Sequence, residues 1–381
     1  MVSCAPVHIM KFDRDKARKL MLEKELDCVM ATSHDNVYYT SGSDIMTITN
    51  LKRLAAVLLP LDADPVFAVH ANEEVTARQR TWIKDVRVYR GGEWEPLKPV
   101  EFVADVLKER GLGKARIGIE LFDMQALCVD HLRNLLPAAE FVDSQPVFDK
   151  LRSVKSPEEL RLLSDANMAT AKAITVAFEM ARPGDTERDI AKDMINLLVE
   201  YGADTIAFVV LGAGPNIFET HHIAADYKIK EGDMVHTDFG GFFKGYMSDI
   251  SRTAVVGKPD HTQLKAYEIA VQAERVAAEA MQKGALVMDI HNCVKQFYES
   301  KGYPYVWAFI GHSIGIGCHE YPFLGPSHGS WVLESGMFFE VEPMVRTGHA
   351  RVHTEDAFIV GEGPAKNVSE YRDISEMQVI R

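Results

Sequence analysis

Apolar residues in the first 150 positions recur in two patterns, one helical and one typical of short buried strands. Residues 15–26, DKARKLMLEKEL, space their apolar side chains as an amphipathic helix does. Four short apolar runs predict buried strands: CVMAT, AAVLLP, PVFAV and ARIGIE. The segments SGSD and LDADP supply turns. This half is therefore predicted to be α/β. It contains no tight cluster of histidine and acidic residues, and we assign it no chemistry of its own.

The pattern changes at SVKSPEELRLL, which begins at residue 153. Ser156 is a favourable helix N-cap, Pro157 suits the first helical position, and Glu159 completes a capping box. A long alanine-rich helix is predicted to follow and to end before RPGD. We therefore expect a domain boundary near residue 152, with one domain over residues 1–151 and a second over residues 152–381.

The second half repeats itself at an offset of one hundred residues. Each copy is predicted to contain a helix, a glycine break, a capped helix, a glycine stop and then strands. The matched positions in the two copies are Ala166, Ala173, Val176, Ala177, Gly184, Asp189, Ile190 and Gly202 against Ala266, Ala273, Val276, Ala277, Gly284, Asp289, Ile290 and Gly302. Matched glycines and caps favour duplication over chance. A duplicated α+β unit places a pocket between its copies, over the strands.

Two acidic residues stand on either side of a glycine-rich bend in HTDFGGFFKGYMSDISRT, residues 236–253. The flanking segments alternate like strands and FKGY supplies a turn, so Asp238 and Asp249 are predicted to face one another across a hairpin. Two unit charges ~4 Å apart repel by about 4 kcal/mol at an effective dielectric constant of ~20. The pair alone is also compatible with solvated aspartates. We expect His236 to point to the opposite face of its strand, and Arg252 to pair structurally with a carboxylate.

Further metal-binding residue types follow in the second copy. His312 and His319 lie in the glycine-rich segment GHSIGIGCHEYP. Glu342 in FFEVEP and Glu355 in VHTEDAFIV stand in apolar strand-like segments, where an unpaired carboxylate is unfavourable. Four acids and one imidazole suit a pair of divalent cations, which neutralise the carboxylates.

Composition narrows the choice of partner and compartment. Of the 381 residues, 47% are hydrophobic and 25% are charged. These fractions are ordinary for a soluble globular protein. Its net charge of −13 argues against nucleic acid or an anionic membrane as the main partner. The first residues lack the apolar core of a secretory signal, and no apolar run is long enough to span a bilayer. Five scattered cysteines without a CxxC pair argue against a disulfide framework or a thiolate zinc site. We expect a cytoplasmic protein.

These residues resemble the pita-bread metallopeptidases, which include methionine aminopeptidases, Xaa-Pro aminopeptidases and prolidases; creatinase shares the fold without the metals. The resemblance implies an α+β fold, with a creatinase-type α/β domain over residues 1–151 and a duplicated pita-bread catalytic domain over residues 152–381. It implies a homodimer. The metal ligands that it implies are Asp238, Asp249, His312, Glu342 and Glu355. His221 and His319 match the two histidines that face the substrate in this family.

The expected chemistry is hydrolysis of a small peptide or amide. Carboxylate-rich ligation favours manganese, with cobalt, iron(II) or zinc as alternatives. Two such ions lower the pKa of a bridging water, and the resulting hydroxide attacks the carbonyl. His221 and His319 are expected to hold the substrate or stabilise the oxyanion, and Glu342 to carry the proton to the leaving nitrogen.

Two departures from the family pattern leave the substrate open. His353 stands where prolidase-like members usually carry arginine, and Met344 and Arg346 replace the usual glycine and tyrosine. We expect His353 to contact the substrate, or else to support the neighbouring ligand Glu355. An Xaa-Pro dipeptidase or aminopeptidase is the leading hypothesis. The alternatives are a creatinase-like amidinohydrolase or metal-dependent lyase on the same fold, and a catalytically silent binding protein.

Overall fold

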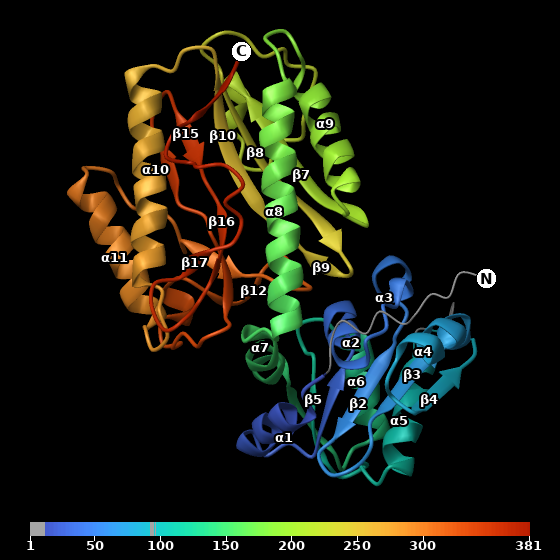
Figure 1. Cartoon of the computed structure of the whole chain (residues 1–381). Coiled ribbons are helices and arrows are strands. Elements are labelled where there is room, and N and C mark those ends of the chain that lie inside the picture. The colour runs from blue at the N-terminus through green and yellow to red at the C-terminus, as the bar shows by residue number, and fades with distance from the viewer. Residues whose placement is uncertain (1–11, 92–94, 96) are drawn as a thin grey trace. The chain divides into compact units, whose positions relative to one another are not determined.

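The computed structural model describes residues 12–91, 95 and 97–381. The expectation about a secretory signal concerns residues 1–11 in part, and these, with Cys4, lie outside the described residues. The chain divides into two compact units, Met1–Leu151 and Arg152–Arg381 (Figure 1). Within the described part of the chain, no helix combines the length and the apolarity needed to cross a bilayer.

The first unit is built on a six-stranded sheet in the order β4-β3-β2-β1-β5-β6. Strand β2 is antiparallel to both of its neighbours and every other pair is parallel, so all strands except β2 point the same way. The strands are β1 (Cys28–Ala31), β2 (Ala56–Pro60), β3 (Val66–His70), β4 (Asp85–Tyr89), β5 (Arg116–Ile119) and β6 (Glu140–Asp143). The helices are α1 (Arg14–Glu23), α2 (His34–Ser41), α3 (Met46–Leu51), η1 (Ala71–Glu73), α4 (Glu74–Arg80), α5 (Lys98–Glu109), α6 (Ala126–Leu135) and α7 (Gln145–Ser153). The predicted α/β character of this half is confirmed.

The second unit begins with α8 (Pro157–Met180), whose start follows from its sequence. The hydroxyl of Ser156 accepts a hydrogen bond from the backbone N–H of Glu159, and the Glu159 carboxylate accepts one from the N–H of Ser156. This is the predicted capping box, with Pro157 at the first helical position. Small apolar residues of α8 are buried against β8 and β10.

Two α+β layers make up this unit. Helices α8 and α9 (Glu187–Glu200) lie along the sheet β18-β10-β8-β7, and α10 (His261–Ala280) and α11 (Val287–Ser300) accompany the sheet β12-β11-β13-β16-β17 (Figure 1). The first sheet contains β7 (Thr205–Ala213), β8 (Met234–Phe243), β9 (Tyr246–Met247), β10 (Ile250–Val256) and β18 (Gln378–Ile380). The second contains β11 (Gly311–Ser313), β12 (Glu320–Phe323), β13 (Phe338–Val341), β16 (Asp356–Ile359) and β17 (Lys366–Asn367). The short helix η2 (Gly214–Phe218) connects β7 to β8, and η3 (Pro326–His328) lies between β12 and β13. The two-stranded ribbon of β14 (Met344–Arg346) and β15 (Arg351–His353) lies between β13 and β16.

The internal repeat is visible in the element order and in matched backbone conformations. Gly184 and Gly284 have φ values of 100° and 87°, and each donates its N–H to a carbonyl at 2.8 Å. Gly202 and Gly302 end the second helix of each copy with φ values of 107° and 77°. Left-handed backbone of this kind favours glycine. The duplicated α+β architecture is therefore confirmed.

Candidate metal centre

Asp238 and Asp249 lie at the antiparallel junction of β8 and β10, but not directly opposite one another. Asp238 pairs with Ser251 in β10, and Asp249 stands in the short gap between β9 and β10. The hairpin is therefore bent just before Asp249. Side-chain oxygens of both aspartates nevertheless lie within 4.8 Å of each other and of an oxygen of Glu355.

The close approach of Asp249 depends on a glycine and on a helix. A Cβ atom at Gly240 would collide with the carbonyl oxygen of Ser248, so only glycine allows the returning chain to pass this close. Ser248 then exchanges backbone and side-chain hydrogen bonds with Gly241. On the other side, the N–H of Asp249 donates to Oδ1 of Asn167 in α8 at 2.9 Å. The aspartate is thus held by β8 and α8 together.

The remaining candidates come from the second copy. His312 lies on β11, while Glu342 directly follows β13 and Glu355 directly precedes β16. Nε2 of His312 is 3.6 Å from carboxylate oxygens of both Glu342 and Glu355, and 3.9 Å from Oδ2 of Asp249. The N–H of Glu355 donates to the carbonyl of Ser251 at 3.1 Å, which joins this loop to β10. Both copies therefore supply side chains to one cluster.

The cluster is buried and strongly acidic. Asp249, His312 and Glu355 are all less than 5% exposed. Burial raises the pKa of Asp238 and of Asp249, and the neighbouring Glu355 adds to both shifts. Burial also raises the pKa of Glu342. For His312, burial alone lowers the pKa, but Glu355 and Glu342 outweigh it and the pKa is raised. Positive charge bound among these carboxyl groups would therefore stabilise the cluster.

The donor set fits divalent metal ions. Oδ1 of Asp238 and Oδ1 of Asp249 are buried, and neither has a hydrogen-bond partner among the described residues. Buried carboxylate oxygens without partners are costly unless a cation binds them. Carboxylates and an imidazole are also the ligands that manganese, iron, cobalt and zinc accept. Metal ions would complete the coordination that the protein atoms leave unfilled.

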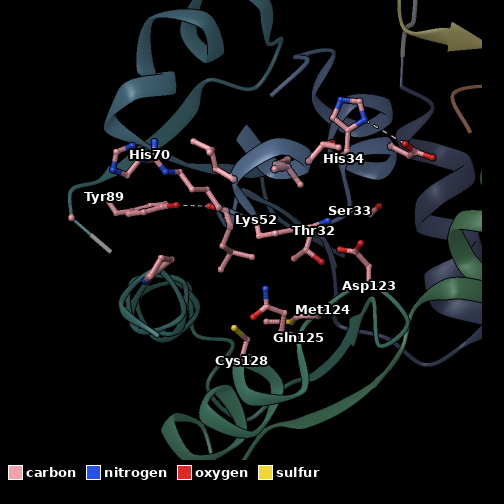
Figure 2. Close-up of a pocket in the computed structure, with 18 residues that line it drawn as sticks. Thr32, Ser33, His34, Lys52, His70, Tyr89, Asp123, Met124, Gln125 and Cys128 are labelled. Carbon is pink, nitrogen blue, oxygen red and sulfur yellow. Dashed lines mark hydrogen bonds and ion pairs between the residues drawn. The ribbon is translucent and has the colours of Figure 1, made fainter. Parts of the chain in front are cut away.

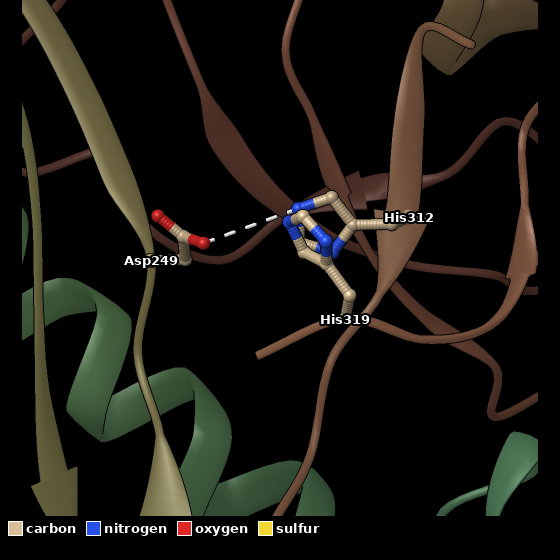
Figure 3. Close-up of side chains that lie close together, drawn as sticks. All are labelled: Asp249, His312 and His319. Carbon is tan, nitrogen blue, oxygen red and sulfur yellow. Dashed lines mark ion pairs between the residues drawn. The ribbon is translucent and has the colours of Figure 1, made fainter. Parts of the chain in front are cut away.

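The ring of His319 lies beside that of His312 (Figure 3), and His319 is exposed. Its ring centroid is 4.2 Å from that of His312, and one of its nitrogens lies within 4.8 Å of donor atoms of Asp249 and His312. Burial lowers the pKa of His319 to about 4, with His312 and His221 adding to the shift, so its ring is neutral near pH 7. His221 itself is exposed and acts on His319 electrostatically, without joining the groups of potential metal ligands found among the described residues.

The segment that carries His319 is anchored by a buried ion pair. Glu320 lies 2.7 Å from Nζ of Lys155 and also contacts the guanidinium of Arg152. The side chains of Glu320 and Lys155 are 5% and 1% exposed. Burial raises the pKa of Glu320, but the two cations outweigh it and the pKa is lowered. Glu320 is therefore ionised and ties the loop after β11 to the start of the second unit.

His353 contacts a different glutamate from the one that its sequence position indicates. Its Nε2 lies 3.4 Å from Oε2 of Glu342, and its side chain is 4% exposed. Nδ1 of His353 is 3.2 Å from Nε2 of His236, whose Nδ1 lies 3.3 Å from the guanidinium of Arg351. The expectation that His236 faces away is wrong, because residues two apart on a strand share a face and His236 therefore points toward the same side as Asp238.

Several residues near the cluster have no clear sequence signal. The thiol of Cys318 donates to Oδ2 of Asp249 at 3.0 Å. Its place directly before His319 in the sequence is what indicates that it could lie near the cluster. Glu340 on β13 pairs with His312 on β11 and is fully buried. Burial raises the pKa of Glu340 well above its usual range. Arg252 pairs with Asp356 at 2.6 Å, which confirms its predicted structural role.

Comparisons with known proteins agree with this architecture. Residues 161–362 match the model of metallopeptidase family M24, and residues 14–154 match the creatinase/prolidase N-terminal domain. The chain is 28% identical over 367 residues to the Xaa-Pro dipeptidase of Pyrococcus furiosus, covering 95% of this chain and 98% of that one. It is 29% identical over 351 residues to the Xaa-Pro dipeptidase of Lactobacillus helveticus, covering 91% and 93%. The crystal structure of dipeptidase PepE from Mycobacterium ulcerans superimposes with a TM-score of 0.85 at 26% identity, covering 96% of each chain.

Proposed function

Because the chain belongs to metallopeptidase family M24, we propose that it hydrolyses Xaa-Pro dipeptides with two divalent metal ions at the candidate metal centre. Membership of the family and the similarity to Xaa-Pro dipeptidases over more than nine-tenths of the chain support a metal-dependent peptidase. The observation that carries the proposal is the meeting of four carboxylates with His312 in one buried cluster. Such a cluster is unstable without cations.

The proposed ligands divide between the two copies of the repeat: Asp238 and Asp249 from the first, His312, Glu342 and Glu355 from the second. When bound, divalent ions would polarise the scissile carbonyl and make a water molecule nucleophilic near neutral pH. The protein then has to orient the amide, exclude competing water and move one proton.

His319 is the proposed donor to the developing oxyanion. Its pKa of about 4 leaves a neutral ring at pH 7, whose N–H donates a hydrogen bond without giving up the proton. Glu342 is the proposed proton carrier, because its carboxyl lies beside His312 in the cluster and burial raises its pKa. His221, exposed and acting on His319, is proposed to contact the substrate.

We propose that His353 supports the side chain of Glu342 and does not recognise the substrate. The 3.4 Å contact with Glu342 and the 4% exposure of its side chain support that role. The exposed Arg346, which lies over the ring of Phe218, remains a separate candidate for substrate contact. Substrate selection therefore does not require an arginine at position 353.

Manganese is the proposed metal, because the donor set holds four carboxylates and a single imidazole. Cobalt, iron(II) and zinc remain alternatives. A homodimer and a cytoplasmic location stay predictions, to be tested by light scattering and by fractionation of the source cells.

The proposal is tested by assaying the manganese-loaded protein with Ala-Pro, Ala-Ala, Ala-Pro-Ala and creatine. We expect release of proline from Ala-Pro and none with Asp249→Asn, because that substitution removes one of the charges that hold the metals. Asp226→Asn is the matched control, since Asp226 is 82% exposed and pairs only with Arg188 among the described ion pairs. Turnover of creatine without turnover of Ala-Pro would replace the peptidase proposal by the amidinohydrolase alternative.

A further inference from the structure

Glu187 is a buried carboxylate that takes no part in the candidate metal centre. It is the first residue of α9, its exposed fraction is 0%, and it belongs to none of the groups of potential metal ligands found among the described residues. A carboxylate removed from water is unfavourable unless hydrogen-bond donors replace the water. The donors around Glu187 therefore show which part of the chain it holds.

Four donors surround this carboxylate. Oε1 of Glu187 accepts from the N–H of Ala213 at 2.7 Å and from Nδ2 of Asn216 at 2.9 Å. Oε2 accepts from the N–H of Ala225 at 2.9 Å, and Nε2 of His222 lies 2.9 Å from the same oxygen. A carboxylate has about four lone-pair positions that accept hydrogen bonds. These four contacts therefore use its full capacity as an acceptor.

All four donors lie in one loop, residues 213–225. The loop leaves the sheet at Ala213, the last residue of β7, forms the short helix η2 and returns to the same carboxylate at Ala225. The two ends of the loop thus bind the two oxygens of one side chain. The N–H of Arg188 also donates to the carbonyl of Ala225 at 3.1 Å, so a backbone contact reinforces the attachment. The start of α9 therefore fixes both ends of the loop.

His222 holds the part of the loop that carries the exposed His221. Its Nε2 faces Glu187 and its Nδ1 lies 2.8 Å from Oε2 of Glu219, with 11% of the His222 side chain exposed. Its carbonyl accepts a hydrogen bond from the N–H of Leu211 in β7 at 3.2 Å. Burial alone lowers the pKa of His222, but Glu219 and Glu187 outweigh it and the pKa is raised. Both the ring and the backbone of His222 are therefore held in place.

A second contact connects the same loop to the metal centre. The carbonyl of Ile217, within η2, accepts a hydrogen bond from the guanidinium of Arg351 at 2.8 Å. Arg351 is 3% exposed and begins the chain of polar contacts that leads through two buried histidines to Glu342. His221 is also close enough to His319 to add to the lowering of the pKa of His319. The loop therefore carries His221 near the proposed metal ligands.

We propose that Glu187 and His222 are positioning residues that hold His221 at the metal centre. This role rests on the substrate contact proposed for His221, and neither positioning residue itself touches the substrate. Because His222 directly follows His221 in the sequence, the contacts of His222 with Glu187 and Leu211 limit the movement of the neighbouring side chain. A change at Glu187 therefore reaches the substrate through His221.

Glu187→Gln tests this role in the manganese-loaded full chain. Glutamine has one acceptor oxygen and an NH₂ group that cannot accept, so two of the four donors lose their partner. A catalytic group displaced by about 1 Å can cost up to about 10²-fold in rate, and we expect kcat/KM for Ala-Pro to fall about tenfold through a higher KM. Metal content should not change, because the five proposed ligands are untouched. Glu200→Gln, at the exposed last residue of the same helix, is the matched control and should leave kcat/KM unchanged.

A double-mutant cycle separates positioning of His221 from a general structural effect. In the His221→Ala background, Glu187→Gln has no histidine left to position, so it should lower kcat/KM by no more than about twofold. The same loss of about tenfold in both backgrounds would overturn the proposal. His222→Leu removes one of the four contacts and leaves the other three, so it runs the same cycle, with a smaller loss, if Glu187→Gln does not fold.

Hydrogen exchange read by mass spectrometry does not depend on hydrolysis. Peptides covering residues 213–225 of metal-loaded Glu187→Gln should exchange several-fold faster than those of the unmodified protein, because backbone N–H groups that bind Glu187 lose an acceptor. Peptides from the pocket of the first unit, whose lining includes Met124, Gln125 and Cys128 (Figure 2), should exchange at an unchanged rate and serve as the internal control. Unchanged exchange of residues 213–225 would overturn the proposal. If the unmodified protein does not hydrolyse Ala-Pro, the proposed function fails by itself, and the exchange rates still decide whether Glu187 holds the loop.

Discussion

His353 joins Glu342 to a chain of buried polar side chains that ends at Arg351. A ligand whose partner is removed loses its fixed orientation, which typically costs 10- to 100-fold in metal affinity. We therefore predict that His353→Leu weakens metal binding by about that factor. Titration of the metal-free variant with Mn²⁺ by calorimetry measures this directly.

The control for His353→Leu is His328→Leu. Among the described residues, the ring of His328 contacts the rings of Tyr321, Phe323 and Trp331 and that of no proposed metal ligand. Its metal affinity should be that of the unmodified protein. If His353→Leu binds Mn²⁺ normally but shows a raised KM for Ala-Pro, position 353 recognises the substrate carboxylate after all.

A substitution of His319 tests its proposed role as donor to the oxyanion separately from metal binding. His319→Ala is predicted to lower kcat by about 10²-fold, the typical effect of removing one transition-state donor. Metal content should remain close to that of the unmodified protein, because Asp249 keeps its contacts with Cys318 and Asn167. Steady-state assays together with elemental analysis separate the two effects. Unchanged turnover would make His319 a structural residue.

At the scale of elements, the bend between β8 and β10 depends on Gly240. Gly240→Ala should push the chain at Ser248 away and displace Asp249 with it. A displacement of about 1 Å at a catalytic group can cost about 10²-fold in rate, so we predict a loss of that order with the fold retained. Gly348→Ala is the matched control, because a Cβ there meets no atom within 4 Å. An active Gly240→Ala enzyme with normal metal content would show that this close approach is dispensable.

The loop that carries Cys318 and His319 depends on the buried pair of Lys155 and Glu320. A buried charge left without any partner typically costs about 3 to 5 kcal/mol. In Lys155→Met the guanidinium of Arg152 still contacts Glu320, so we predict a loss in the free energy of unfolding that is below this figure but above about 1 kcal/mol, measured by urea denaturation. Lys283→Met breaks an ion pair that is 54% and 78% exposed, and should cost no more than about 1 kcal/mol. Equal stabilities of the two variants would contradict the assigned anchoring role.

Local signals account for the elements that the sequence predicts well. The capping box at Ser156 acts within one helical turn, so the start of α8 is readable from four residues. The backbone at positions 184 and 284 is left-handed, a conformation that favours glycine, so the paired glycines mark the same turn in both copies. Strands β11 and β14 are three residues long and carry too few positions to show an alternating pattern. Their existence follows from pairing with distant strands, which a local pattern does not encode.

Within the site, too, some features follow from local sequence and others depend on contacts between distant residues. Residue type, local motif and the resemblance to the family indicate the five proposed ligands, and donor atoms of all five lie in one cluster. The pairing of Asp238 with Ser251, the contact of His353 with Glu342 and the anchor at Lys155 depend on side chains that are far apart in sequence. No periodicity specifies such contacts.

In the whole molecule, all the proposed metal ligands lie in the second unit, where both halves of a duplicated structure supply them. Metal ions that bind the folded second unit stabilise it by mass action. Chelation should therefore lower the melting temperature of that unit and leave the first unit's transition unchanged.

The number of metal ions per chain decides whether the cluster is a dinuclear metal centre. Protein freed of metal, reconstituted with Mn²⁺ and desalted is analysed by inductively coupled plasma mass spectrometry alongside the Ala-Pro assay. We predict a stoichiometry near two, and loss of both metal and activity in Asp249→Asn but not in Asp226→Asn. Full hydrolytic activity in protein that contains no divalent metal would contradict it.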